Sequence, residues 1–333
     1  MNISDKKVVV TGGAGFIGSH LVDVLLDARN HVTVLDNFSS GSRTNLAHLE
    51  GNSLFTVVDG DIRDRSVLKN ALRGADVVYH LAVQCLRLSF KNPELVHDVN
   101  ATGTLSVCME SVACGVQRLI YVSSSEVYGS AVSAPMSEKH PLEPTTVYGA
   151  SKAAGELYAL ACFRTYGLQS TVVRPFNTYG PRAHFEGAYG EVIPKFVLRM
   201  LNGMPPVIFG NGEQTRDFTY VTDTARGIYA ASACDELVGQ AVNIARGEEV
   251  SIKQLARIVA KGLGQESPPP KHMNARPADV LRHFADTAKA RDLAGFTAEI
   301  GLQHGVRLYC DWFRSQGYNL KALLAQDNVI NWQ

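Results

Sequence analysis

The sequence predicts an α/β protein whose core is a doubly wound parallel sheet, with a smaller C-terminal lobe. Short runs rich in β-branched residues alternate with helical segments over the first half of the chain, which is typical of parallel strands joined by helices. These runs are apolar almost throughout, as expected for a sheet covered by helices on both faces. The first run also leads directly into a glycine-rich turn.

The expected elements follow one another in regular order. Strands are expected at residues 7–10, 31–35, 54–58, 76–80, 118–122 and 169–173, and helices at 18–29, 65–73, 96–114 and 148–166. The helix over 148–166 is apolar almost all round, so we expect it to be buried against the sheet on one side and against a partner subunit on the other.

The composition changes after Arg174. The chain becomes rich in Gly, Pro, Tyr and Asn, with a helix expected at 193–201, a strand at 240–244, a helix at 251–262 and a helical region ending at about 315. We therefore assign residues 1–177, with about 218–245, to the sheet domain. Residues of about 178–217 and 246–320 form the second lobe, and the tail 321–333 has no predicted structure.

Composition excludes several classes of protein. Lys and Arg together number 32 and so do Asp and Glu, so no general field for nucleic acid is expected. The six cysteines are scattered and indicate free thiols in a reducing cytoplasm. No apolar run approaches membrane-spanning length. The histidines lack metal-ligand spacing, so no metal is expected.

The glycine-rich turn follows the first strand and opens a helix. Gly12 permits a tight turn, Gly15 lets backbone N–H groups approach a pyrophosphate, and Gly18 lets the helix pack closely on the strand. Asp36 ends the second strand, where a carboxylate accepts hydrogen bonds from both ribose hydroxyls of NAD. The pattern predicts a Rossmann-type dinucleotide site, although glycines also mark ordinary turns.

Three further residues bear on the choice of cofactor. The carboxylate of Asp36 repels the 2′-phosphate of NADP, whereas Arg43, a few residues further on, is an argument for NADP. Asp61 and Ile62 follow the third strand, where an adenine edge would lie, and Asp61 can alternatively cap the next turn. We expect NAD.

A second set of residues indicates proton transfer. Tyr148 and Lys152 are four residues apart and therefore lie on one face of a helix. A tyrosine titrates near pH 10, but a neighbouring ammonium and the positive ring of oxidised nicotinamide favour the phenolate, which can then act as a base. Ser124 lies at the carboxyl end of the fifth strand, where ligands gather, and can donate to the same substrate oxygen.

In this order the motifs resemble those of the extended short-chain dehydrogenase/reductase family, in particular its NAD-dependent nucleotide-sugar epimerases and dehydratases. The resemblance covers nearly the whole chain and rests on residues 11–18, Asp36, 59–64, 80–82, 99–104, 123–129, 148–152, 174–182, 215–223 and 276–279. It implies a Rossmann-type sheet with a substrate-binding C-terminal lobe, bound NAD, a nucleotide-sugar substrate, and a homodimer built on the helices at 96–114 and 148–166.

The resemblance also implies roles for single residues. Ser124 would contact the sugar 4-hydroxyl, Tyr148 would be the base, and Lys152 would hold the nicotinamide ribose. The implied cofactor site comprises Gly12, Gly15, Phe16, Ile17, Gly18, Asp36, Asn37, Asp61, Ile62, Leu81, Ala82, Tyr148, Lys152 and Pro175. The implied substrate site comprises Gln84, Ser125, Asn177, Arg182, Val192, Arg216, Arg276 and Asp279.

Within the substrate site, Arg216 and Arg276 would clamp a diphosphate, a task that suits guanidinium groups, unless they are charges at the rim. Asn177 would touch the diphosphate region, and it can alternatively stabilise a turn. Asp279 would support the nucleotide end, and it can alternatively cap a helix. The residues that shape the sugar pocket are expected to be Gln84, Cys85, Arg87 and the loop 184–189, including His184 and Glu186.

Glu126 decides between reactions that share a first step, the oxidation of the sugar at C4. Similar dehydratases and decarboxylases also carry Glu at this position, where it can remove the C5 proton. Ser125, by contrast, stands where one dehydratase branch has an acidic residue, and residues 180–196 resemble a segment of UDP-hexosamine 4-epimerases. Glu126 can also simply bind a sugar hydroxyl or a backbone amide.

We therefore prefer a 4-epimerase acting on a UDP-hexose or UDP-uronate type of substrate. A 4,6-dehydratase is the second interpretation and a UDP-glucuronate decarboxylase the third. A dinucleotide-binding sensor without catalysis is a hypothesis of another class. Such proteins lose Ser, Tyr or Lys from the catalytic set, and this chain retains Ser124, Tyr148 and Lys152.

Overall fold

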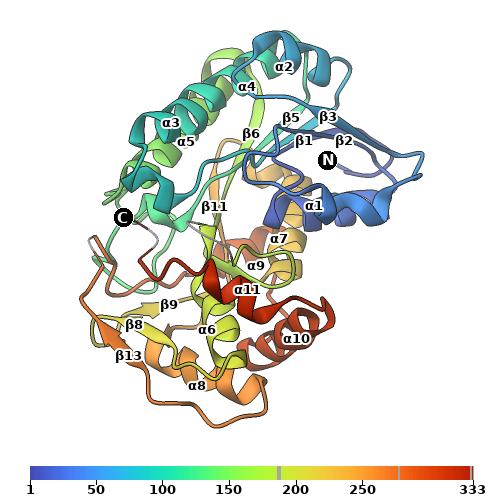
Figure 1. Ribbon diagram of the computed structural model, residues 1–333. Coiled ribbons are helices and arrows are strands. Elements are labelled where there is room, and N and C mark those ends of the chain that lie inside the picture. The colour runs from blue at the N-terminus through green and yellow to red at the C-terminus, as the bar shows by residue number, and fades with distance from the viewer. Residues whose placement is uncertain (186–188, 277, 331, 333) are drawn as a thin grey trace.

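The computed structural model describes residues 1–185, 189–276, 278–330 and 332 and is centred on a seven-stranded sheet (Figure 1). The strands lie in the order β11-β6-β5-β4-β1-β2-β3, and every neighbouring pair is parallel. Their bounds are β1 (Lys7–Thr11), β2 (His31–Asp36), β3 (Phe55–Asp59), β4 (Val77–His80), β5 (Arg118–Val122), β6 (Gln169–Pro175) and β11 (Ala241–Ile244). The order runs outward from β1 in both directions, which confirms the predicted doubly wound sheet.

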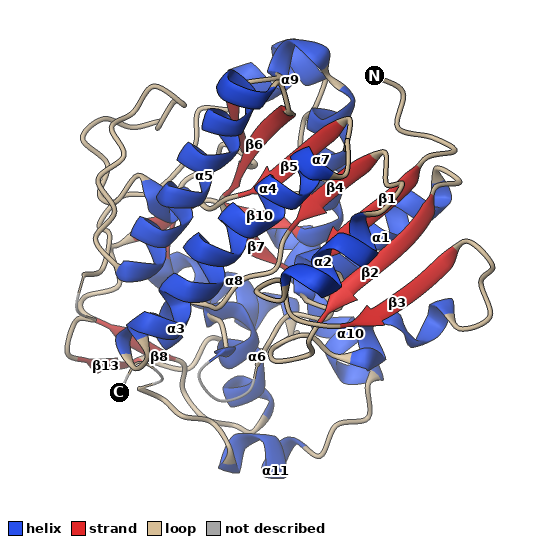
Figure 2. Cartoon of the chain, turned by 90° about the horizontal axis from the view of Figure 1, so that it is seen from above, coloured by secondary structure: helices blue, strands red, loops and turns tan. Residues whose placement is uncertain are grey.

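Helices cover both faces of the sheet (Figure 2). One layer contains α1 (Phe16–Asp27), α7 (Val221–Ala233) and α9 (Ala288–Ala294), and the other contains α2 (Arg65–Leu72), α4 (Thr104–Ala113) and α5 (Val147–Tyr166). Each layer closes its own apolar core against the strands, so the strands are buried on both sides, as their near-continuous apolar sequences require.

Helix α5 has well-defined ends. The Thr146 hydroxyl accepts a hydrogen bond from the Gly149 N–H at its start, and Gly167 ends it with a φ of 74°, a conformation that favours glycine. Within the single chain, Leu157 on α5 is 59% exposed and Leu105 on α4 is 38% exposed. The expected burial of this face by a partner subunit stays a prediction.

The helix predicted at 96–114 contains a wide turn. It starts as α3 (Pro93–His97), passes through a π-helical turn at Asp98–Gly103 and continues as α4. π-Helical turns inside α-helices are frequent at functional sites. This one carries Asn100, whose amide Oδ1 accepts from the Gln84 N–H at 2.8 Å and whose Nδ2 donates to the Gln84 carbonyl at 3.1 Å.

The second lobe has a core of its own. It is built on α6 (Val192–Leu201), α8 (Ile252–Gly262) and α10 (Leu302–Ser315). Three two-stranded sheets accompany them: β7 (Asn177–Tyr179) with β10 (Phe218–Tyr220), β8 (Val207–Phe209) with β13 (Lys271–Met273), and β9 (Thr215–Arg216) with β12 (Val250–Ser251).

Two elements modify the expected division of the chain. Residues 246–320 were assigned to the second lobe, yet Ala290 of α9 and the nearby Phe296 pack into the core of the sheet domain. The tail, which had no predicted structure, forms a short helix, α11 (Leu320–Ala325), against the second lobe. Among the described residues, no helix has both the length and the apolar character needed to cross a membrane.

Candidate functional site

A cavity of about 450 Å³ lies at the carboxyl ends of the strands and extends into the second lobe. Ligands bind at this edge in open α/β sheets. The predicted catalytic, cofactor and substrate residues all line the cavity except Ser125 and Arg182. The Ser125 carbonyl accepts a hydrogen bond from His283 at 3.1 Å, and Arg182 forms an ion pair with Asp23 on α1 at 2.8 Å.

The glycine-rich turn between β1 and α1 has no space for side chains at Gly12 and Gly18. Gly12 has a φ of 72°, and a Cβ atom there would lie 2.6 Å from the backbone nitrogen of Ala82. A Cβ on Gly18 would lie 2.2 Å from the Gly12 carbonyl oxygen. The first turn of α1 therefore approaches the ends of β1 and β4 closely, which is the geometry that presents helix N–H groups to a pyrophosphate.

Asp36 is held in place by the same turn. Its carboxylate accepts hydrogen bonds from the Ala14 N–H at 2.9 Å and the Phe38 N–H at 2.8 Å, and burial raises its pKa. Arg43, the residue that could favour NADP, forms an ion pair with Asp59 at 2.7 Å and stacks over the Phe38 ring at 3.9 Å. The residues present thus fit NAD.

Asp61 lies beside the expected adenine position. Its carboxylate accepts hydrogen bonds from Asn37 and Arg63, and the Arg63 hydrogen bond is the main reason that its pKa is lowered to about 2. It also accepts from the Arg63 backbone N–H at 2.8 Å, which is the turn-capping role considered as the alternative. Asp61 both caps the turn and lines the cavity.

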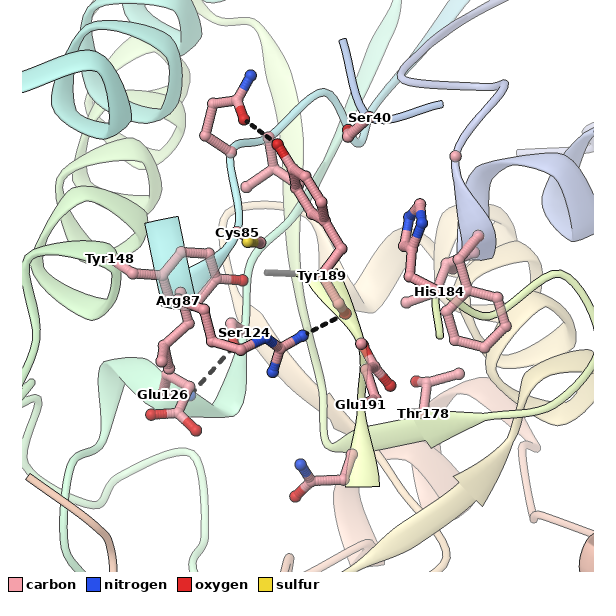
Figure 3. A pocket seen from close by; sticks show the side chains of 18 of the residues that line it. Ser40, Cys85, Arg87, Ser124, Glu126, Tyr148, Thr178, His184, Tyr189 and Glu191 are labelled. Atoms are coloured by element: carbon pink, nitrogen blue, oxygen red, sulfur yellow. Dashed lines mark hydrogen bonds between the residues drawn. The ribbon is translucent and has the colours of Figure 1, made fainter. Parts of the chain in front are cut away.

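The three residues of the proton-transfer set come together from two elements. Ser124 follows β5, while Tyr148 and Lys152 lie in the first turns of α5, and all three line the cavity. Figure 3 shows Ser124 and Tyr148 facing the same space. The Lys152 ammonium donates to the Val122 carbonyl at 2.7 Å and lies 4.4 Å from the centre of the Tyr121 ring.

Burial dominates the acid–base properties of this set. It raises the pKa of Tyr148, and the hydrogen bond with Ser124 opposes this shift only in part. Burial also lowers the pKa of Lys152 to about 7, against the opposing effect of Glu156. A phenolate on Tyr148 therefore needs additional positive charge, such as the oxidised nicotinamide considered in the sequence analysis.

Glu126 lines the cavity on the side of the second lobe. Its backbone N–H donates to the Ser124 hydroxyl at 3.2 Å. Its carboxylate is close enough to favour the charged forms of Arg216 and His283 electrostatically, although burial lowers the pKa of both. Glu126 thus approaches the arginine side of the cavity as well as the Tyr148 side.

The predicted diphosphate residues form one cluster. Arg216 donates to Asp279 at 2.6 Å and to the carbonyls of Thr215 and Val280 at 2.7 Å, and Arg276 donates to Asp279 at 2.8 Å. Asp279 therefore orients both guanidinium groups at the cavity wall. The buried Oδ1 of Asn177 has no hydrogen-bond partner within the described residues, so it is available to a ligand.

The expected sugar pocket is formed largely by side chains that hold one another (Figure 3). Arg87 donates to the Tyr189 carbonyl at 2.7 Å, the Tyr189 hydroxyl reaches Gln84 at 3.4 Å, and the Gln84 amide donates to Ser39 at 3.1 Å. Cys85 and His184 line the same part of the cavity. Glu186 lies outside the described residues.

Several residues of the cavity were missed by sequence reasoning. Glu191 precedes α6, and burial raises its pKa. Lys195 and Arg199 follow it at helical spacing, a pattern that could have indicated one face of a helix directed at a ligand. Asp327, Val329 and Trp332 reach the cavity from the tail, where no local pattern predicted them.

Known proteins with this organisation were identified by sequence. The model of the "NAD dependent epimerase/dehydratase family" matches residues 8–245. A putative UDP-glucose 4-epimerase of Methanocaldococcus jannaschii is 35% identical over 92% of this chain and 98% of its own length. UDP-glucuronic acid decarboxylase 1 of Xenopus tropicalis is 33% identical over 93% of this chain and 73% of its own length.

Solved structures lead to the same group of proteins. A UDP-N-acetylglucosamine 4-epimerase of Methanobrevibacter ruminantium superposes with a TM-score of 0.88 and 35% identity, over 94% of this chain and 99% of its own. A dTDP-glucose 4,6-dehydratase of Streptomyces venezuelae, solved with NAD, superposes with a TM-score of 0.89 and is 33% identical. The match covers 96% of this chain and 100% of its own. The chain is an enzyme of the NAD-dependent epimerase/dehydratase family, with NAD as the cofactor of that family.

Proposed function

We propose that this enzyme is a nucleotide-sugar 4-epimerase, with a UDP-hexose or UDP-uronate type of substrate. Epimerisation at C4 requires a reversible oxidation, rotation of the resulting 4-keto sugar, and reduction from its other face. Only one proton acceptor is needed, because the same group returns the proton at the end of the cycle. Ser124, Tyr148 and Lys152 supply this minimum.

In this proposal each residue has a defined task. Tyr148 accepts the proton of the 4-hydroxyl while Ser124 donates a hydrogen bond to the same oxygen. Lys152, anchored to the Val122 carbonyl, holds the cofactor ribose with its remaining N–H groups. Gly12, Gly15 and Asp36 would hold NAD, which supplies the hydride acceptor and donor. Arg216 and Arg276, oriented by Asp279, would bind the diphosphate.

One observation favours epimerisation over elimination. Elimination needs an acid for the leaving hydroxyl in addition to a base at C5, and in one dehydratase branch the resemblance places that acid at the position of Ser125. Here the residue is a neutral serine that is 4% exposed and lies outside the cavity lining. The Methanocaldococcus relative, a putative UDP-glucose 4-epimerase, and the Methanobrevibacter structure, a UDP-N-acetylglucosamine 4-epimerase, support the same conclusion.

The second candidate is a 4,6-dehydratase or a decarboxylase, and Glu126 is the observation that favours it. Its place in the cavity beside Tyr148 would allow a carboxylate to act at C5. Dehydratase and decarboxylase relatives match almost as well as the epimerases do.

Incubation with UDP-, dTDP-, GDP- and CDP-sugars in the presence of NAD, followed by NMR, tests the choice. An epimerase gives the C4 epimer, whereas a dehydratase gives a 4-keto-6-deoxy sugar and a decarboxylase releases carbon dioxide. In an epimerase, Glu126→Gln should keep turnover within about fivefold. In a dehydratase it should remove a general base and cost about 10²–10⁴-fold. A 4-keto-6-deoxy product from the wild type would overturn the proposal.

We also propose a homodimer that packs through the outer faces of α4 and α5. The resemblance implies this interface, and Leu105 and Leu157, which are exposed on these two helices in the single chain, could be buried in it. The six free cysteines support a reducing cytoplasm as the location. Sedimentation of the wild type and of Leu157→Glu would test the dimer.

A further inference from the structure

The tail of the chain returns to the ligand cavity. Helix α11 is fixed to the end of α6 by a hydrogen bond from the Asn202 amide to the Leu320 carbonyl at 3.2 Å, and Leu323 and Leu324 pack on the core of the second lobe. After α11, Asp327, Val329 and Trp332 contribute to the cavity lining.

Asp327 fastens this segment. Its carboxylate lies 3.2 Å from the Lys195 ammonium and 3.3 Å from the Arg199 guanidinium, and only 3% of its side chain is exposed. Lys195 also donates to the Asn328 carbonyl. Since both cations lie on the cavity-facing side of α6, the tail is tied to the helix that forms one wall of the cavity.

Trp332 extends that wall. Its ring packs edge-to-face on Phe209 of β8, with the ring centres 4.6 Å apart, and both side chains line the cavity. Val207 and Phe218 line it as well, so this part of the cavity is apolar and aromatic. Such surfaces suit the flat face of a nucleobase.

Provided that the substrate is a nucleotide sugar, as proposed above, we infer that the tail forms one wall of the nucleoside subsite. Trp332 contacts the base, and Asp327 is the positioning residue that holds Trp332 there. With its sugar at Tyr148 and its phosphates at Arg216 and Arg276, the substrate has only its nucleoside left to place. The aromatic part of the second lobe receives it.

Fluorescence tests this inference without any chemistry. The chain has two tryptophans, and Trp312 stacks on Tyr309 in α10 and does not line the cavity. In Trp312→Phe, Trp332 is therefore the sole indole. UDP, dTDP, GDP and CDP are titrated in turn into this variant and into the wild type, and the tightest binder is used afterwards. Binding should quench the emission of Trp332.

Truncation then measures the contribution of the ring. Trp332→Ala should raise the Kd of that nucleotide about 5- to 100-fold, the usual cost of losing an aromatic contact to a base. NAD binding should stay unchanged. The Kd of inorganic pyrophosphate, which carries no base, should not respond either.

Asp327→Asn separates positioning from general stability. It should weaken nucleotide binding in the presence of Trp332 and have little further effect in Asp327→Asn/Trp332→Ala, because Asp327 acts through that ring. Asp292→Asn, which removes an exposed ion pair with Arg291, is the matched control and should change nothing.

These measurements distinguish a failure of the proposed role of the tail from a failure of the nucleotide-sugar assignment. Unchanged Trp332 emission and Kd values on nucleotide binding would overturn the role of the tail while leaving the proposed function intact. Tighter binding in Trp332→Ala would show instead that the tail blocks the cavity, which also overturns the inference. Failure of all four nucleotides to bind the wild type would refute the nucleotide-sugar assignment and this inference with it.

Discussion

The two halves of the cavity are built by different means. On the sheet side, the main chain defines the wall of the cavity. Gly12 and Gly18 allow α1 to pack against the strands, and two main-chain N–H groups hold the Asp36 carboxylate. On the side of the second lobe, long cationic side chains are held by carboxylates, with Arg216 and Arg276 on Asp279 and Lys195 and Arg199 on Asp327. The main chain determines the shape of the cofactor half, whereas side chains that can be substituted determine the shape of the substrate half. Substitutions can therefore change the choice of substrate while the cofactor is kept.

The largest expected effect lies where the halves meet. Tyr148→Phe removes the proton acceptor and should lower kcat about 10²–10⁴-fold. The Kd values for NAD and for the substrate should change less than about threefold, because no backbone contact of either half is altered. Stopped-flow assays of turnover and equilibrium titrations measure both. A variant with normal turnover would remove Tyr148 from the mechanism.

The second effect is on stability and arises from the buried amine of Lys152, which lies between the two halves of the cavity. The pKa of Lys152 falls from 10.5 to about 7 in the folded protein, so between these values the unfolded chain binds more protons. The free energy of unfolding should therefore rise with pH from 7 to 10, by up to about 1.4 kcal/mol per pH unit from this group. Urea unfolding should show a steeper rise in the wild type than in Lys152→Met, because Lys195 and Lys289, whose pKa values are also lowered, remain in both proteins. Equal slopes would contradict the assigned pKa.

The third effect compares two glycines with nearly the same backbone. Gly12 has a φ of 72° and Gly74 a φ of 73°, but a Cβ would clash only at Gly12, since nothing lies within 4 Å of one at Gly74. Gly74→Ala should cost about 1–2 kcal/mol for the left-handed conformation. Gly12→Ala should cost a further ~1–3 kcal/mol for overpacking and should also weaken NAD binding. Thermal unfolding and NAD titration measure these losses, and equal losses would mean that close packing is not what the turn requires.

The smallest effect tests the side-chain half. Arg216→Lys keeps the charge but loses the guanidinium geometry that reaches Asp279 and two carbonyls, so the substrate KM should rise about tenfold while the Kd of NAD is unchanged. Arg282→Lys, in an exposed ion pair with Glu249, is the matched control. If Arg216→Lys weakened NAD binding equally, the two halves would not be independent.

The same contrast explains what could be predicted from sequence. The strands, α1 and α5 were expected close to their observed bounds because periodicity, glycines and caps are local signals. The tail was not, since Asp327 pairs with residues about 130 positions earlier, and such contacts leave no pattern in a single sequence. The burial that raises the pKa of Tyr148 in the absence of the cofactor could not be predicted either, because the degree of burial is not readable from residue spacing.

The wide turn at Asp98–Gly103 has a consequence for how this protein can vary. This turn accommodates one more residue than a regular helical turn. From this turn, the Asn100 side chain forms hydrogen bonds with both the N–H and the carbonyl of Gln84. Deleting a single residue there would restore ordinary helical winding and swing the amide by about 100° around the axis. The loop after β4 would then lose its anchor, so a single deletion in this turn can reshape the space around the sugar.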